Sequence, residues 1–159
     1  MTINVFKSKV LNNKSNKPTD PITTEIIRNS LNSSAEQMKK VLIRSSFSPI
    51  IYEVLDFASA IYDQNYCMLA QSPSLPGFMG TLSFCVEQAV KEVGGESNLF
   101  DGDIIIYNNP YGSGSHSQDV AIVKPVYLEK KLIGYTAIKA HWLDTGGKEP
   151  YSTDTVDVF

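Results

Sequence analysis

A strong helix-start signal at Asp20 most constrains the fold of this chain. Asp20 is a preferred N-cap residue, and Pro21 suits the first helical position, where no intrahelical hydrogen bond is lost. The apolar residues that follow recur at three- to five-residue steps, which places them on one helical face. "SSFSP" ends the pattern, because Pro49 cannot continue a helix. We therefore expect a long helix whose apolar face comprises Ile22, Ile26, Leu31, Ala35, Met38 and Leu42.

Two β-hairpins and a second helix are expected after it. "FASAIYD" and "CMLAQ" flank a polar connector at 63–66, and "VAIVKPVYLEKKLIGYTAIKAHW" predicts a hairpin that turns at 129–131. Between them, "TLSFCVEQAVKEV" predicts a helix ended by Gly94 and Gly95. The apolar strand at 103–108 lacks polar alternation, so we expect it to be covered on both faces. The predicted class is α+β: a mainly antiparallel or mixed sheet with the second helix packed on it.

The two ends of the chain differ from this middle region. Residues 1–18 are rich in Lys and Asn without a lasting period, which predicts a flexible arm ahead of an ordered region at 19–159. The last residues, "YSTDTVDVF", alternate like an unfinished strand. Either this strand pairs internally, or the chain is the front part of something longer.

Composition excludes several classes of function. With 42% hydrophobic and 19% charged residues, the chain is expected to fold rather than to be disordered. A net charge of -3 without a basic run gives no electrostatic basis for binding nucleic acid or an anionic membrane. No membrane span or signal peptide is evident. Cys67 and Cys85 lie in apolar surroundings without CxxC spacing, which favours two buried, reduced thiols in a cytoplasmic protein over a disulfide.

Four donor side chains stand out as candidate metal ligands. His116 and Asp119 are three residues apart in the Gly- and Ser-rich loop "NNPYGSGSHSQD", close enough to face one centre. His141 ends the last clear strand, just before a Gly-rich loop, where sites often lie. Asp56 stands in "EVLDFASA", where burying its carboxylate is costly unless a cation compensates it.

Each of these residues also has an ordinary interpretation. His116 can be a surface histidine, His141 a hydrogen-bonded core histidine beside Trp142, and Asp56 a turn cap. Taken together, two imidazoles and two carboxylates suit Zn²⁺, Mn²⁺ or Fe²⁺ better than Ca²⁺ or Mg²⁺. Such an ion lowers the pKa of bound water or polarises a carbonyl. The residues alone identify no general base.

The order of motifs resembles that of the hydantoinase B/oxoprolinase family. The resemblance runs from about Asp20 to Phe159. This family includes N-methylhydantoinase B subunits, the C-terminal half of 5-oxoprolinase, caprolactamase and subunits of acetone and acetophenone carboxylases. The resemblance is carried by "DPITTEIIRNSLNSSAEQMKKVLIRSSFSPIIYEVLDFASAIYD", "LAQSPSLPGFMGTL", "FDGDIIIYNNPYGSGSHSQDVAIVKPVY" and "AHWLDTGG".

That resemblance implies a metal-dependent role shared with a partner. It implies a divalent metal (Zn, or Mn or Fe) at the positions of Asp56, His116, Asp119 and His141. It also implies an A-type subunit that binds ATP and Mg and activates the substrate, a cyclic amide or a ketone. Family members continue well beyond this length, so residues 19–159 resemble the N-terminal, metal-binding region of a B-type subunit. The remaining C-terminal part is then a further partner, and the fragment alone is expected to be inactive.

Three functions remain open at this point. The first is ATP-dependent hydrolysis of a cyclic amide such as a hydantoin, a lactam or 5-oxoproline. The second is ATP-dependent ketone carboxylation, and the third is a truncated, non-catalytic assembly module. The departures from the family pattern leave substrate choice open, because residues around the ligands tune the ion. These departures are Asn109, Ser117, Gln118, Trp142 and the "EVLDFA" form of the Asp56 motif.

Overall fold

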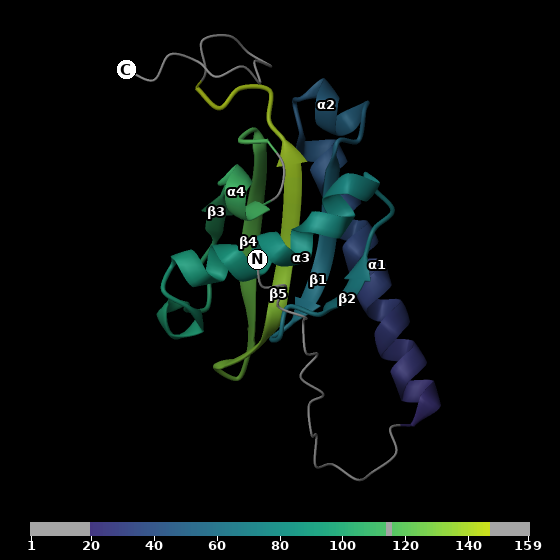
Figure 1. The fold of residues 1–159 in the computed structure, drawn as a ribbon. Coiled ribbons are helices and arrows are strands. Elements are labelled where there is room, and N and C mark those ends of the chain that lie inside the picture. Colours follow the sequence, from purple (N-terminus) through teal and green to yellow (C-terminus); the bar gives the residue numbers. More distant parts are fainter. Residues whose placement is uncertain (1–19, 114–115, 147–159) are drawn as a thin grey trace, which may run out of the picture.

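The computed structural model describes residues 20–113 and 116–146. The predicted arm at 1–18 and the strand-like pattern at 151–159 lie outside these ranges. Within them the chain forms a five-stranded sheet with helices on its two faces (Figure 1). The predicted α+β class is therefore confirmed.

The first helix, α1 (Pro21–Ser45), starts and stops where the sequence indicated. The Asp20 carboxylate accepts hydrogen bonds from the backbone N–H groups of Ile22 (3.3 Å) and Thr23 (3.1 Å). These bonds satisfy two donors that have no partner within the helix. At the other end, Ser46 is extended, and a four-residue helix that the sequence pattern did not reveal, α2 (Pro49–Tyr52), follows.

The sheet has the strand order β2-β1-β5-β4-β3, and every neighbouring pair is antiparallel. Both predicted hairpins are confirmed, the first as β1–β2 and the second as β4–β5. The hairpins meet along β1 and β5, and β5 is the central strand of the sheet. The strands are β1 (Phe57–Asp63), β2 (Met68–Gln71), β3 (Ile105–Tyr107), β4 (Asp119–Leu128) and β5 (Lys131–His141).

The second helix, α3 (Pro76–Glu92), packs on one face of this sheet, as expected (Figure 1). It begins at Pro76 rather than at the predicted Thr81. A proline breaks the interior of a helix, but it is well accommodated in the first turn. Its apolar face buries Leu82, Val86 and Ala89 against alternate residues of β1, β3, β4 and β5. The main hydrophobic core therefore lies between α3 and the sheet. Two short helices, η1 (Glu96–Asn98) and α4 (Pro110–Ser113), lie in the connections on either side of β3.

Helix α1 lies on the opposite face, against β1 and β2 (Figure 1). Ser59 of β1 donates a hydrogen bond to the Ala35 carbonyl oxygen (3.4 Å), and Ala35 is the residue of α1 that is fully buried. Most of the expected apolar face is exposed; Ile22 is 71% and Ile26 64% exposed. The described residues thus leave much of this helix without a packing partner.

Two further expectations were wrong. The strand at 103–108 is not covered on both faces among the described residues: Ile105 is buried, whereas Ile104 and Ile106 are 58% and 65% exposed. The sequence showed that these positions are apolar, but not which element would cover them. Cys67 is exposed, whereas Cys85 is buried, and both are free thiols. No helix within the described ranges is both long and apolar enough to cross a membrane.

Candidate metal centre

Three of the four candidate ligands stand in one row across adjacent strands. Asp119, the first residue of β4, pairs with His141, the last residue of β5. The backbone N–H of His141 donates to the carbonyl oxygen of Asp56 (3.1 Å), just beyond the Phe57–Ala140 pair of β1 and β5. Strand pairing therefore brings together side chains that are far apart in sequence.

The alternation of side chains along each strand determines the sheet face on which these candidate ligands lie. Residues two apart on a strand share a face, and Ala58 and Ala121 both belong to the core beneath α3. Asp56 and Asp119 therefore lie on the α3 side of the sheet, at the end where β5 finishes. His116 reaches this end from the preceding turn, in which the Asp119 N–H donates to the His116 carbonyl oxygen (3.1 Å).

The Asp119 carboxylate lies between the two imidazoles. Its Oδ1 is hydrogen-bonded to His141 Nδ1 at 2.7 Å, and its Oδ2 lies 3.4 Å from His116 Nδ1. Oδ2 also accepts a hydrogen bond from the His116 backbone N–H (2.9 Å). The two rings are 6.0 Å apart and nearly perpendicular. Asp119 is fully buried and His141 nearly so, while 64% of the His116 side chain is exposed, so the site opens to solvent on the His116 side.

This arrangement fits the requirements for holding a divalent cation. His116, Asp119 and His141 each offer a ligand atom, and these atoms all lie within 4.8 Å of one another. Two imidazole nitrogens and a carboxylate oxygen are typical ligands of Zn²⁺, Mn²⁺ and Fe²⁺. Three protein ligands also leave room for a further group at the metal, as catalytic sites require.

Asp56 adjoins this trio without belonging to the closely spaced group. Its Oδ1 is buried and meets no hydrogen-bond donor among the described residues. Burial raises the pKa of the Asp56 carboxyl, while the two histidines, His141 before His116, oppose that shift and Asp119 reinforces it. A buried carboxylate oxygen without a donor is costly, and a nearby cation would offset that cost. The ligand role of all four residues stays a prediction.

Lys139 is a buried charge near the site that the sequence interpretation missed. It is two residues before His141, on the same face, and is fully buried. Its Nζ lies 3.4 Å from Thr81 Oγ1 and 5.2 Å from the centre of the Phe78 ring, both on α3. Burial lowers the pKa of Lys139, whereas Cys85 and Asp119 oppose that shift. The signal was available, since a lysine interrupts the apolar run "YTAIKAH".

Three other acids, Asp63, Asp144 and Glu53, have different surroundings. Asp63 lies at the far end of β1, where its Oδ1 accepts the N–H groups of Asn65 and Cys67 (2.8 Å each) and closes the hairpin turn. Asp144 accepts the Gly146 N–H (2.8 Å) in the loop after β5. Glu53 is exposed at the end of α2. Their contacts are those of turn and surface residues.

Known proteins are similar to this chain in sequence and in fold. The family model described as Hydantoinase B/oxoprolinase matches residues 20–159. The chain belongs to the hydantoinase B/oxoprolinase family. An uncharacterised protein of Methanocaldococcus jannaschii is 37% identical over 134 residues, and the 5-oxoprolinase of Dictyostelium discoideum is 34% identical over 133. Each match covers 84% of this chain.

A solved relative supports the hydantoinase B-type fold. The crystal structure of ATP-dependent caprolactamase from Pseudomonas jessenii superposes with a TM-score of 0.72 at 29% identity, covering 83% of this chain. In every case the match is a small part of the relative. The chain spans 24% of the Methanocaldococcus protein, 10% of the 5-oxoprolinase and 22% of the caprolactamase chain.

Proposed function

We propose that this chain is the metal-binding part of a hydantoinase B-type subunit that takes part in ATP-dependent hydrolysis of a cyclic amide. The amide is of the hydantoin, lactam or 5-oxoproline type. An A-type partner binds ATP and Mg and activates the substrate, and the larger part of the B-type polypeptide completes the site. The observation that carries the proposal is the convergence of His116, Asp119 and His141 at one end of the sheet.

The identity of the relatives supports hydrolysis over the other two functions. The Dictyostelium relative is named 5-oxoprolinase, and the Pseudomonas structure is that of an ATP-dependent caprolactamase. Both names describe opening of a cyclic amide. The clustered donor side chains count against a non-catalytic assembly module, because such a module needs no convergent imidazoles and carboxylate.

The residues of the site have distinct parts in the proposal. When bound, the divalent cation polarises a carbonyl group and stabilises negative charge that develops on its oxygen. Asp119 holds both imidazoles in place, through its contacts at 2.7 and 3.4 Å. Asp56 adds a second negative charge beside them, and the exposed His116 side leaves an approach for the substrate.

Metal analysis of the isolated chain is the direct test. The chain is freed of metal with a chelator, titrated with Zn²⁺, Mn²⁺ and Fe²⁺, and its metal content measured. We expect one ion per chain for the wild type and weaker binding, by about 10- to 100-fold or more, in His141→Ala and Asp119→Asn. Asp144→Asn, whose carboxylate caps a nearby loop, is the matched control and is expected to bind as the wild type does.

Activity requires the whole assembly. The chain is combined with an A-type subunit and the rest of a B-type polypeptide, and coupled ATP hydrolysis and ring opening of hydantoin, caprolactam and 5-oxoproline are measured. Ring opening that is lost in Asp119→Asn supports the proposal. Metal-free wild-type protein, or carboxylation of a ketone without ring opening, contradicts it.

A further inference from the structure

The described residues cover only part of the sheet face opposite α3. Helix α1 packs on β1 and β2, at one side of this face, and leaves the part formed by β5, β4 and β3 open (Figure 1). Alternate residues of these strands point to it, among them Ile138 and Ile122, and Ile104 lies beside them just before β3. This region is therefore an apolar sheet surface without a covering layer among the described residues, and apolar sheet surface is ordinarily buried against another layer.

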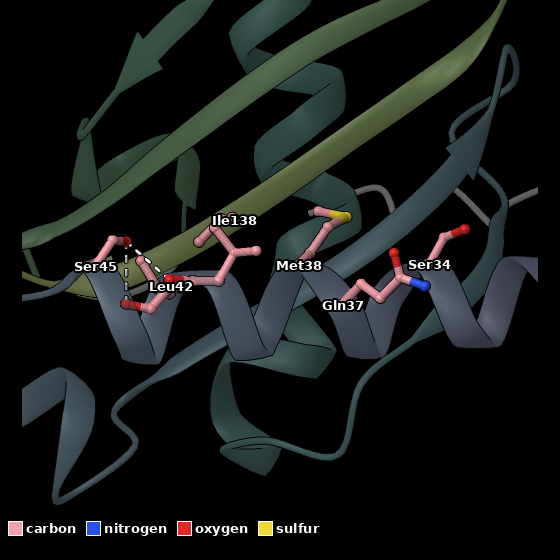
Figure 2. Close-up of a pocket in the computed structure, with 7 residues that line it drawn as sticks. Ser34, Gln37, Met38, Leu42, Ser45 and Ile138 are labelled. Atoms are coloured by element: carbon pink, nitrogen blue, oxygen red, sulfur yellow. Dashed lines mark hydrogen bonds between the residues drawn. The ribbon is translucent and has the colours of Figure 1, made fainter.

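Two adjoining hollows make the open region a continuous apolar groove. The first, of about 470 Å³, lies between α1 and β5, where Met38 and Leu42 project toward the strand that carries Ile138 (Figure 2). The second, of about 290 Å³, continues over β4 to Ile104 and Ile122. Met38 and Ile138 line both hollows, so they join them. We call this surface, formed by Met38, Val41, Ile104, Ile122 and Ile138, the apolar groove.

The groove exposes several large apolar side chains, which is unusual for the surface of a protein without a partner. Val41 is 65% exposed, Ile104 58% and Ile122 38%. Lys124 is the charged side chain among the described residues that line the two hollows. Contiguous apolar surface of this kind marks a protein interface, and depletion of charge at its centre is typical of permanent interfaces rather than transient ones.

We propose that the apolar groove is the docking surface for the polypeptide that corresponds to the larger, unmatched part of the hydantoinase B-type relatives. This inference rests on the proposed function, because it takes the chain to act within a B-type subunit. Its basis is the length of those relatives: the matched region is 24% of the Methanocaldococcus protein and 22% of the caprolactamase chain. The remaining polypeptide in each is long enough to supply the missing layer on this face.

The character of the groove favours this occupant over the A-type subunit or a second copy of the chain. Packing within one subunit is permanent and resembles a domain core, which matches a groove whose lining is mainly aliphatic, with serine, glutamine, threonine and Lys124 beside the aliphatic residues. The edge strand β3, three residues long, also borders the groove and offers backbone groups to a further strand. The metal centre lies on the other face, so docking leaves it accessible to substrate and to the A-type partner.

Co-expression with the unmatched part of a relative tests the inference, because neither polypeptide then has to fold alone. The full chain is co-expressed with the Methanocaldococcus protein that lacks its matched region, and separately with the caprolactamase chain shortened in the same way, and the affinity of each purified complex is measured. Ile122→Lys places a charge in the groove. Ile133→Lys is the matched control, since Ile133 is also on an exposed strand position (46%) but lines neither hollow. Thermal unfolding verifies that both variants are folded.

We expect a one-to-one complex that Ile122→Lys weakens about tenfold or more and Ile133→Lys changes by less than about threefold. The proposal is overturned by the absence of a complex with either polypeptide or by equal weakening in the two variants. It is also overturned if Ile122→Lys instead disrupts a dimer of this chain or its binding to an A-type subunit.

Measuring both metal binding and docking distinguishes a failure of this inference from a failure of the proposed function. Asp119→Asn is expected to lose metal and to dock as the wild type does. A wild-type chain that docks but holds no metal overturns the proposed function alone, and one that holds metal but does not dock overturns the docking surface alone.

Discussion

Replacing Asp56 with alanine is expected to stabilise the metal-free chain, although it removes a carboxylate from the candidate metal centre. The Asp56 Oδ1 atom is buried and has no donor among the described residues, and burial raises the pKa of this carboxyl. An unsatisfied buried polar group costs about 1–3 kcal/mol. Because Asp56 is only half-buried, the low end applies, and the variant should gain about 1 kcal/mol. That corresponds to a rise of about 2–4 °C in Tm for a chain of this size.

The opposite sign is expected at Asp119. This carboxylate is fully buried and is hydrogen-bonded to the largely buried His141, so Asp119→Ala leaves that imidazole without its partner. Leaving a buried polar group unsatisfied costs about 1–3 kcal/mol. The two substitutions delete the same chemical group at the same end of the sheet, and the difference in hydrogen-bond partners sets the direction of the effect.

Urea and thermal unfolding in EDTA, and then in Zn²⁺, measure both effects. At a Zn²⁺ concentration 100 times the Kd, the metal should add about 2.7 kcal/mol to the stability of the wild type. Asp56→Ala should keep its higher stability in EDTA and gain less from Zn²⁺ than the wild type does. A variant that is destabilised in EDTA, or that gains as much from Zn²⁺ as the wild type, would refute this account of Asp56.

Three further outcomes are expected from the core and the sheet. Burial raises the pKa of Cys85 from 9.0 to about 11, opposed by Lys139, so the stability that this thiol contributes below pH 9 should be lost as the pH rises to 11. The loss is about 2–3 kcal/mol, and urea unfolding at pH 8 to 11 should show a loss that is larger by about this amount in the wild type than in Cys85→Val. Gly134→Ala would push a methyl group into the Tyr62 carbonyl oxygen and should destabilise the chain by about 1–3 kcal/mol, whereas Gly77→Ala, which has open space, should be neutral or slightly stabilising in the same thermal assay. Leu82→Ala should lower the free energy of unfolding by about 2–5 kcal/mol in urea, because this α3 side chain is fully buried between the helix and the sheet.

Much of the fold could be predicted from local signals in the sequence. The Asp20–Pro21 start of α1 and the polar connector of the β1–β2 hairpin are set by residues close in sequence, and both were predicted correctly. The short helix α2 was missed because four residues carry too little periodicity to identify a helix. The cover of β3 was misjudged because it depends on which distant element packs there, and its apolar residues cannot show that.

The sequence predicted which residues form the candidate site from their chemical type, but it did not predict how they are arranged in space. An aspartate amid apolar residues and two histidines near strand ends pointed to Asp56, His116 and His141 as metal ligands. Their arrangement in a row depends on the pairing of β1, β5 and β4, which the sequence does not reveal directly. Lys139 was missed because a lysine on a strand is ordinarily exposed, and only the packing of α3 makes it buried.

The alignment of the site along a strand row limits how the β4–β5 hairpin can change. Successive residues on a strand face opposite sides, so a deletion of a single residue between Asp119 and the turn would rotate the aspartate away from His141 to the α1 side. Changes by two residues, or changes confined to the turn at Glu129 and Lys130, would preserve the facing of both side chains. Insertions or deletions in this hairpin should therefore be tolerated when they comprise two residues or lie within the turn. A change of one residue within a strand should abolish the proposed metal binding, because Asp119 and His141 would then point to opposite faces.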